Sequence, residues 1–250
     1  MPLPRVLLVE DDPALRRFVA LALENMDNIE LVQCDSVATA LVFLAKEPFR
    51  LILTDLMMPG ESGFDLLVRL KDTPALRGSA RVAVLSAGLT PVARERLAGL
   101  EVWRLLSKPV SVSALVACVN DALQGGDAAI APEGDPLSQW HRGGDRAHAI
   151  QEYFEGNEEL FDAYRSACIA QFPQDISQGD AASAAGELQN LRRVAHSLKS
   201  VLLTLGYPIA SAQARTLEET SHSGMRELAR DQWAGLRRAV EQVLPDPGSP

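Results

Sequence analysis

Cysteine is scarce in this sequence. The chain has 250 residues but only three cysteines, Cys34, Cys118 and Cys168, which stand far apart. A set so small and so widely spaced predicts reduced thiols in a cytoplasmic protein rather than a disulfide framework. Long apolar runs are missing too. None approaches the roughly 20 residues that a helix needs to span a bilayer, so we expect no membrane association. The chain begins MPLPRVLLVEDD and soon turns acidic, so we expect no secretory signal.

Basic residues are also fewer than acidic ones. Lysine and arginine number 24 against 33 aspartate and glutamate residues, which gives a net charge of −9. That balance argues against a broad surface that neutralises phosphates, so we expect no nucleic acid among the partners. The shares of hydrophobic residues (47%) and charged residues (23%) are ordinary, which excludes wholesale disorder. A chain of this length is expected to form two domains of roughly 100 to 150 residues each.

The first half of the chain alternates between two patterns. Short runs of aliphatic and β-branched residues predict strands at 5–9, 29–34, 50–54, 80–86 and 102–106. Apolar residues at helical spacing predict helices near 13–26, 36–46, 63–72, 90–98 and 111–124. Five such strand–helix units predict an α/β domain over residues 1–124, with a doubly wound, five-stranded parallel sheet. In that architecture functional groups gather at the carboxyl ends of the strands.

Composition changes after residue 124. Residues 125–140 are rich in glycine, alanine, proline and aspartate, which predicts a linker. Helical patterns then follow at 145–155, 157–171, 180–204, 208–222 and 226–244. We expect the helix that begins near residue 157 to break before Pro173. Long amphipathic helices with short connections predict a four-helix bundle over residues 141–245, followed by a tail at 246–250.

Acidic residues follow two of the predicted strands. Glu10, Asp11 and Asp12 come directly after the first strand, and Asp55 follows the third. Parallel strands bring their carboxyl ends to one edge of the sheet, so these carboxylates are expected to converge. Their mutual repulsion is costly unless a cation offsets it, and a site with few oxygen ligands and room for water suits Mg²⁺. The alternative is a solvated acidic turn that caps the helix beginning at Pro13.

Two further polar residues are expected at the same edge. Ser86 follows the fourth strand, and Lys108 follows the fifth. A metal ion and a lysine offset charge on phosphoryl oxygens, and a hydroxyl donates a hydrogen bond to them. The set therefore predicts a phosphoryl site in which Asp55 is the nucleophile and forms an aspartyl phosphate.

Residues 1–124 resemble the receiver domain of bacterial two-component response regulators. The matching motifs are LLVEDDPALRR, LILTDLMMPGESGFDLL, VLSAG and SKP. The resemblance implies that Asp55 is the phosphorylation site and that Glu10 and Asp11 are the metal-binding acidic pair, with Asp12 as the register alternative. It also implies that the backbone carbonyl of Met57 completes the metal ligands.

The same resemblance assigns the remaining residues of this site. Ser86 takes the place of the family's Thr or Ser, and Lys108 matches its lysine. Pro109 matches a proline that the family often holds in the cis form. One departure is Leu105, which stands where the family commonly has Tyr or Phe as a rotameric switch. Trp103 is two positions earlier, so the usual aromatic switch is in doubt while the phosphoryl chemistry should survive.

His196 is the histidine of interest in the second half. Nearby apolar residues recur at helical spacing and predict one buried stripe: Leu188, Leu191, Ala195, Leu198, Leu202 and Leu205. At 100° per residue His196 lies about 140° from Leu191, so we expect it to be exposed. Arg192 and Ser200 lie one turn to either side of it, and Lys199 lies three residues on. An exposed imidazole is either a solvated surface group or a good nucleophile near neutral pH.

The second half resembles histidine phosphotransfer (HPt) domains. The segment AHSLKS, Gly206 ten residues after the histidine, the later RTLEE and the helical pattern carry the resemblance. It implies that His196 is a phosphoacceptor presented in mid-helix, supported by Lys199, Arg192 and Ser200. Ser200 stands where the family often has glycine, and Leu203 occupies another position that is often small.

These assignments predict a phosphorelay protein with phosphoryl groups on Asp55 and His196. We expect Mg²⁺-dependent self-phosphorylation at Asp55. Because we find no ATP-binding signature, we do not expect an ATP-dependent kinase. The expected partners are a sensor histidine kinase, hybrid kinases included, and other receiver or HPt domains. In the alternative, the protein is a phosphate sink or a regulator in which Asp55 phosphorylation controls access to His196.

Two other classes of protein remain open on the residues alone. A metal-dependent phosphohydrolase commonly carries a second acid two residues after the nucleophile, but Met57 stands there. A helical dimerisation or scaffold domain would make His196 incidental. Phosphate found on His196 would reject that view.

Overall fold

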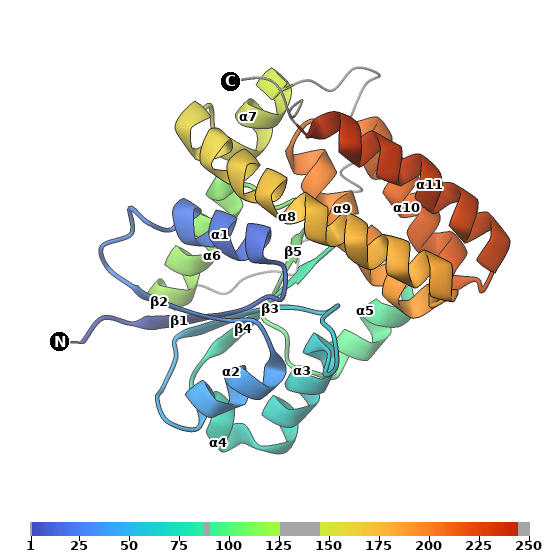
Figure 1. Cartoon of the computed structure of the whole chain (residues 1–250). Coiled ribbons are helices and arrows are strands. Elements are labelled where there is room, and N and C mark those ends of the chain that lie inside the picture. The colour runs from blue at the N-terminus through green and yellow to red at the C-terminus, as the bar shows by residue number, and fades with distance from the viewer. Residues whose placement is uncertain (1, 88–90, 126–145, 245–250) are drawn as a thin grey trace. The chain divides into compact units, whose positions relative to one another are not determined.

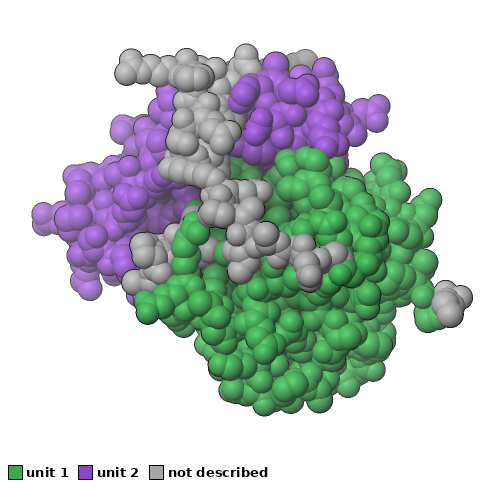
Figure 2. All heavy atoms as spheres, turned by 180° about the vertical axis from the view of Figure 1, so that it is seen from behind, with its two compact units in different colours: residues 1–136 green, residues 137–250 purple. Residues whose placement is uncertain are grey.

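The chain folds into two compact units, residues 1–136 and 137–250 (Figure 2). The computed structural model describes residues 2–87, 91–125 and 146–244. Apart from Gly125, the expected linker at 125–140 lies outside the described residues, and so does the expected tail at 246–250. Each unit is described by itself.

A five-stranded parallel sheet forms the centre of the first unit. Its strands are β1 (Arg5–Val9), β2 (Glu30–Cys34), β3 (Leu51–Asp55), β4 (Arg81–Ser86) and β5 (Arg104–Ser107). The strand order is β2-β1-β3-β4-β5, and every neighbouring pair is parallel. This confirms the predicted doubly wound fold. Because helices cover both faces, β3 is buried along its whole length, as its apolar sequence LILT requires.

Helices flank the sheet on both sides (Figure 1). One face carries α1 (Pro13–Ala22) and α6 (Val112–Gln124). The other carries α2 (Val37–Leu44), α3 (Gly63–Asp72) and α5 (Pro91–Ala98), which share one apolar core with the strands. A short helix that the pattern did not predict, α4 (Pro74–Arg77), follows α3. It is a single turn, too short to show periodicity.

Helix ends fix the loops beside the carboxyl ends of the strands. The Asp12 carboxylate caps α1 by accepting hydrogen bonds from the backbone N–H groups of Ala14 and Leu15. Ser62 and Asp65 form a reciprocal capping box at the start of α3. Such caps satisfy backbone donors that a helix leaves unpaired in its first turn. Both helices therefore begin at defined positions next to β1 and β3.

The described part of the second unit is helical. Its elements are α7 (Arg146–Phe154), α8 (Glu158–Ala185), α9 (Leu188–Thr204), α10 (Pro208–His222) and α11 (Arg226–Val243). Helices α8 to α11 pack in a ring, each against the next and α11 against α8, while α7 packs against α8 and α9. The four long helices thus form the expected bundle. No helix within the described ranges combines the length and the hydropathy needed to span a bilayer.

The predicted break at Pro173 is wrong. Helix α8 runs through this proline and ends before Gly186, which adopts a positive φ of 68°. Buried residues continue at helical spacing on both sides of the proline: Phe161, Tyr164, Cys168, Phe172, Gly179 and Ala182. Pro173 itself is exposed on the outer side of α8. Burial of one continuous stripe therefore outweighs the hydrogen bond that the proline removes.

A close approach of two helices fixes α8 against α11. A Cβ atom at Gly179 would lie 2.1 Å from the ring of Trp233, so only glycine fits there. The indole Nε1 of Trp233 donates to the Asp180 carboxylate at 2.9 Å. The indole is thus held by a hydrogen bond to Asp180 and lies close to the backbone of Gly179.

Candidate functional sites

Three carboxylates meet at the carboxyl ends of β1 and β3. One oxygen each from Glu10, Asp11 and Asp55 lies within 4.8 Å of the others. Strands β1 and β3 are neighbours, so Glu10 lies next to Asp55 just beyond the last paired residues. Glu10 is 1% exposed and Asp55 is 2% exposed. Asp12, the register alternative, is engaged in capping α1 and is not part of this acidic pocket.

Lys108 lies in the same pocket. Its Nζ is 2.6 Å from Glu10 Oε2 and 3.0 Å from Asp55 Oδ2. Its backbone N–H donates to the carbonyl oxygen of Ser86 at 2.7 Å, which ties the end of β5 to the end of β4. The Lys108–Pro109 peptide bond is cis, an isomer that the sequence could not show. The topology thus brings together residues that are 98 positions apart in the chain.

Burial dominates the electrostatics of the pocket. It raises the pKa of Glu10 well above the usual value, although the nearby Lys108 lowers it and Asp55 raises it further. Burial and the charge of Asp55 raise the pKa of Asp11 to about 6. Burial lowers the pKa of Lys108, but the charges of Asp55 and Glu10 outweigh this and raise it overall. Lys108 therefore stays charged, and three carboxylates share one ammonium.

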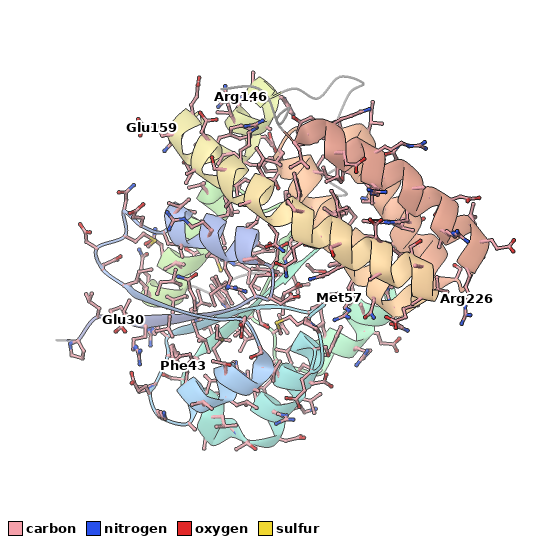
Figure 3. The ribbon with its side chains drawn as sticks, in the orientation of Figure 1. Glu30, Phe43, Met57, Arg146, Glu159 and Arg226 are labelled. Carbon is pink, nitrogen blue, oxygen red and sulfur yellow. The ribbon has the colours of Figure 1, made fainter. Side chains whose placement is uncertain are left out.

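The pocket fits a small divalent cation. Its excess negative charge is buried, and its donors are carboxylate oxygens, which Mg²⁺ prefers over the nitrogen and sulfur ligands of zinc. Met57 follows Asp55 by two residues and lies at the same end of the sheet, opposite the end that carries Glu30 (Figure 3). A role for the Met57 carbonyl as a metal ligand remains a prediction.

Gly63 is a residue of this site that the sequence reasoning missed. A Cβ atom there would lie 1.9 Å from the backbone oxygen of Asp55, and the Gly63 N–H donates to the Leu56 carbonyl at 3.2 Å. The Leu56 N–H in turn donates to Asp55 Oδ1 at 2.6 Å. The glycine thus lets α3 start directly against the backbone of Asp55. The two glycines of the motif PGESG indicate a tight turn or a close backbone approach, but the motif does not show which of them contacts Asp55.

Leu105 occupies the position at which the receiver family commonly has an aromatic residue. Leu105 lies on β5 opposite Val84 and packs against the apolar core. The ring of Trp103 has the guanidinium carbons of Arg81 and Arg104 at 4.6 and 4.5 Å from its centroid. These arginines begin β4 and β5, so Trp103 lies at the end of the sheet that is remote from the acidic pocket.

The second candidate site lies between α9 and α10. His196 Nδ1 is 2.7 Å from Glu218 Oε1, and Lys199 Nζ is 2.6 Å from Glu218 Oε2. One carboxylate thus bridges an imidazole and an ammonium. Burial raises the pKa of Glu218, but the hydrogen bond and charge of His196, with the charge of Lys199, outweigh it and lower the pKa to about 2. Glu218 is therefore ionised at neutral pH.

The prediction that His196 is exposed is wrong. The residue is 9% exposed, and Lys199 is 8% exposed. The helical projection considered the apolar stripe of α9 alone, whereas α10 packs along α9 and its Glu218 contacts both side chains. Ser211 of α10 also donates to the Lys199 carbonyl at 2.7 Å. Glu218 lies in RTLEE, but the periodicity of one helix does not show which glutamate faces its neighbour.

Arg192 and Ser200 flank His196 along α9. They lie one turn before and one turn after it, so the three side chains share one face of the helix. Within the described part of the chain, Arg192 Nε, His196 Nε2 and Ser200 Oγ have no hydrogen-bond partner. The imidazole therefore has one nitrogen engaged with Glu218 and the other without a hydrogen bond.

Known proteins match both units. The model of the response regulator receiver domain matches residues 6–120, and that of the Hpt domain matches residues 148–245. The two-component response regulator ORR12 of Oryza sativa subsp. japonica is 33% identical over 121 residues, which cover 48% of this chain and 98% of that protein.

Longer relatives are matched over only part of their length. The DNA-binding transcriptional regulator NtrC of Azospirillum brasilense is 31% identical over 118 residues, 47% of this chain and 24% of that protein. The chain thus spans about a quarter of the length of such relatives. A crystal structure of a response regulator receiver protein from Pseudomonas putida has 29% identity and a TM-score of 0.45, covering 48% of this chain and 98% of that one. With ORR12 matched over nearly its whole length, the chain belongs to the two-component response regulators and joins a receiver domain to an Hpt domain.

Proposed function

We propose that this protein is a phosphorelay component that carries phosphoryl groups on two residues, Asp55 of the receiver domain and His196 of the Hpt domain. The observation that carries the proposal is the presence of two complementary sites in one chain. One is a buried acidic pocket with a lysine, and the other is an imidazole bridged through Glu218 to Lys199. We further propose that the domains extend over residues 1–124 and 141–245.

In the receiver domain, Asp55 is the nucleophile. A carboxylate oxygen attacks the phosphorus of a donor, either a phosphohistidine or a small acyl phosphate. The new O–P bond forms as the donor's N–P or O–P bond breaks. Lys108, held beside Asp55, offsets the charge on the phosphoryl oxygens. Ser86, the last residue of β4, would donate a hydrogen bond from its hydroxyl to one of them. Bound Mg²⁺ would add positive charge at the same oxygens.

The three acids have separate tasks in this proposal. Glu10, Asp11 and Asp55 would hold the cation, with the Met57 carbonyl as a further ligand. Glu10 also keeps Lys108 in place through its hydrogen bond at 2.6 Å. The cation and the lysine together offset the negative charge that the incoming phosphoryl group adds to a buried site.

In the Hpt domain, Glu218 prepares the imidazole. When the Nδ1–H group of His196 donates to Glu218, the lone pair lies on Nε2, which is then the nucleophile. Nε2 attacks the phosphorus of an aspartyl phosphate, and the N–P bond forms as the carboxylate leaves. The imidazole becomes cationic in this step, and the ionised Glu218 stabilises that charge. Lys199, Arg192 and Ser200 are the residues nearest along α9 for support of the phosphoryl oxygens.

The partners follow from this chemistry. A sensor histidine kinase, hybrid kinases included, would supply the phosphoryl group, and other receiver or Hpt domains would exchange it. The nucleophile must lie nearly in line with the phosphorus and the leaving atom, so a partner receiver must place its own acidic pocket against His196.

The test is to locate the phosphoryl group in the full-length protein. Radiolabelled acetyl phosphate with Mg²⁺ should give a label that survives acid and is lost in base, the behaviour of an acyl phosphate. Asp55→Asn should abolish this label, whereas Asp27→Asn, at an exposed aspartate of the same domain, should retain it. Equal labelling of Asp55→Asn would contradict the assignment.

A second labelling experiment addresses His196. A phosphorylated partner receiver should give a label that is lost in acid and survives base. His196→Gln should abolish it, and His222→Gln, at an exposed histidine of the same bundle, should not. If the aspartate label changes the rate of transfer at His196, the receiver also regulates the Hpt domain. Equal rates would make the two domains independent carriers.

A further inference from the structure

Arg16 connects helix α1 to the acidic pocket. Its side chain returns from the second turn of the helix toward the loop that follows β1. There Nη1 is 2.6 Å from the carbonyl oxygen of Glu10 and 2.8 Å from that of Asp11. These carbonyls belong to the two residues of the loop whose carboxylates enter the pocket.

The loop is held at three points. The Glu10 side chain accepts a hydrogen bond from the Asp12 N–H at 3.3 Å, and the Asp12 side chain caps α1. Arg16 adds the third by binding both peptide carbonyls with one charged donor. The two held carbonyls belong to the peptide planes on both sides of Asp11, which fixes the direction of its Cα–Cβ bond, and the first of them also restricts the backbone of Glu10, because the backbone has only two soft torsions per residue.

We propose that Arg16 is a positioning residue for the metal-binding acid pair. It holds the peptide planes of Glu10 and Asp11 so that both carboxylates point at the position of the cation before the cation binds. The inference rests on the proposed Mg²⁺ site. Arg16 differs from Lys108 in one decisive way: Lys108 binds the carboxylates themselves, whereas Arg16 binds carbonyls and leaves the carboxylates free for the metal.

The charge of Arg16 and its positioning role predict opposite changes in Mg²⁺ affinity when the side chain is removed. The guanidinium is a permanent positive charge near a cation site, so its charge alone weakens Mg²⁺ binding. If Arg16 served only through its charge, Arg16→Ala would bind Mg²⁺ more tightly. If it positions the acids, Arg16→Ala binds Mg²⁺ less tightly despite the gain in electrostatic attraction.

The chain supplies a matched control. Arg17 is the next residue on α1, is exposed, and makes no hydrogen bond or ion pair in the described part of the chain. Arg17→Ala therefore removes one positive charge from the neighbouring position of α1 without touching the loop. Arg16→Lys keeps the charge and replaces the planar, forked donor by a single ammonium.

The experiment measures Mg²⁺ affinity by calorimetric titration of the full-length protein with the metal alone. We expect Arg16→Ala to raise the Kd for Mg²⁺ about tenfold, the effect usual for partners that orient metal ligands. Arg16→Lys should recover part of the loss, and Arg17→Ala should bind as tightly as the wild type or slightly more tightly. Circular dichroism without Mg²⁺ establishes that each variant is folded.

The outcomes separate this inference from the function on which it rests. If the wild type binds no Mg²⁺, the proposed metal site itself is wrong. If the wild type binds and folded Arg16→Ala binds equally or more tightly, the positioning role is overturned. If Arg16→Ala fails to fold, the test uses Arg16→Lys. A Kd for Mg²⁺ clearly above that of the wild type supports the positioning role, and an unchanged Kd overturns it.

Discussion

The acidic pocket and the histidine site differ in how they balance charge. In the pocket the carboxylates of buried Glu10 and Asp55 and of partly buried Asp11 share the ammonium of Lys108, so negative charge is left over. In the Hpt domain one carboxylate, Glu218, lies between an ammonium and an imidazole. The charge of the first site therefore favours the uptake of a cation from solution, whereas the charge of the second is balanced by its own side chains. On the proposed function, a phosphoryl group would therefore meet a metal-dependent site at Asp55 and a metal-independent one at His196.

Metal removal should have the largest effect, because it should act on one site and not on the other. We expect EDTA to reduce the acid-stable label on Asp55 to background, because the uncompensated carboxylates repel an incoming phosphoryl group. A label already present on His196 should persist in EDTA for as long as it does with Mg²⁺. Loss of both labels at the same rate would show that the two sites share a metal requirement.

Gly63→Ala should be the most damaging single substitution in the receiver domain. The new Cβ atom would overlap the backbone of Asp55, which is part of a fully buried strand and cannot move away cheaply. We expect the free energy of unfolding to fall by about 3 kcal/mol, together with a loss of labelling at Asp55. Urea unfolding measures the first effect.

Gly99→Ala is the control for that substitution. Gly99 has open space where a Cβ atom would lie, so its replacement should change the free energy of unfolding by no more than about 0.5 kcal/mol. Equal effects of the two substitutions would mean that general glycine replacement, and not contact with Asp55, causes the loss.

The two sites also differ in how far the sequence predicted them. Residues at the ends of parallel strands must meet at one edge of the sheet, so strand patterns alone placed Glu10, Asp55 and Lys108 together. The predicted strands agree with the observed ones to within two residues because short apolar runs with clear ends leave little freedom. No comparable rule relates two packed helices, whose rotation and register depend on side-chain packing. Glu218 was missed for that reason.

The same limit explains the error at Pro173. Local propensity favours a helix end before a proline. The observed helix continues because apolar residues beyond the proline are buried against other helices. The burial that decides the outcome is a property of the assembled bundle, and a single segment of sequence does not contain it.

Glu218→Gln should change how the free energy of unfolding depends on pH. The pKa of Glu218 is lowered in the folded protein to about 2, below its ordinary value of 4.5. Its contribution to the free energy of unfolding is therefore fully present above about pH 4.5 and is lost as the pH falls toward 2. We expect Glu218→Gln to cost roughly 1 to 3 kcal/mol at pH 7, and the difference from wild type to vanish near pH 2.

The neighbouring glutamate provides the control for this experiment. Glu219 is the next residue on α10, is exposed, and its side chain makes no hydrogen bond or ion pair within the described ranges, so Glu219→Gln removes one carboxylate without touching His196 or Lys199 and should not produce the same pH-dependent difference. Urea unfolding at several pH values measures both variants. A difference for Glu218→Gln that stays constant from pH 7 to pH 2 would contradict the charge-based explanation.

His196→Gln should have the smallest effect on stability. The side chain is nearly buried, which alone would suggest a large cost, but its polar contact is with Glu218, and that carboxylate keeps Lys199 when the imidazole is lost. Glutamine also carries an amide N–H donor, one bond further from Cβ than the Nδ1 atom of histidine. We therefore expect a loss of roughly 0.5 to 1 kcal/mol in the free energy of unfolding, together with complete loss of the acid-labile label. A loss above about 3 kcal/mol would place His196 among the packing residues of the bundle rather than at a site kept for chemistry.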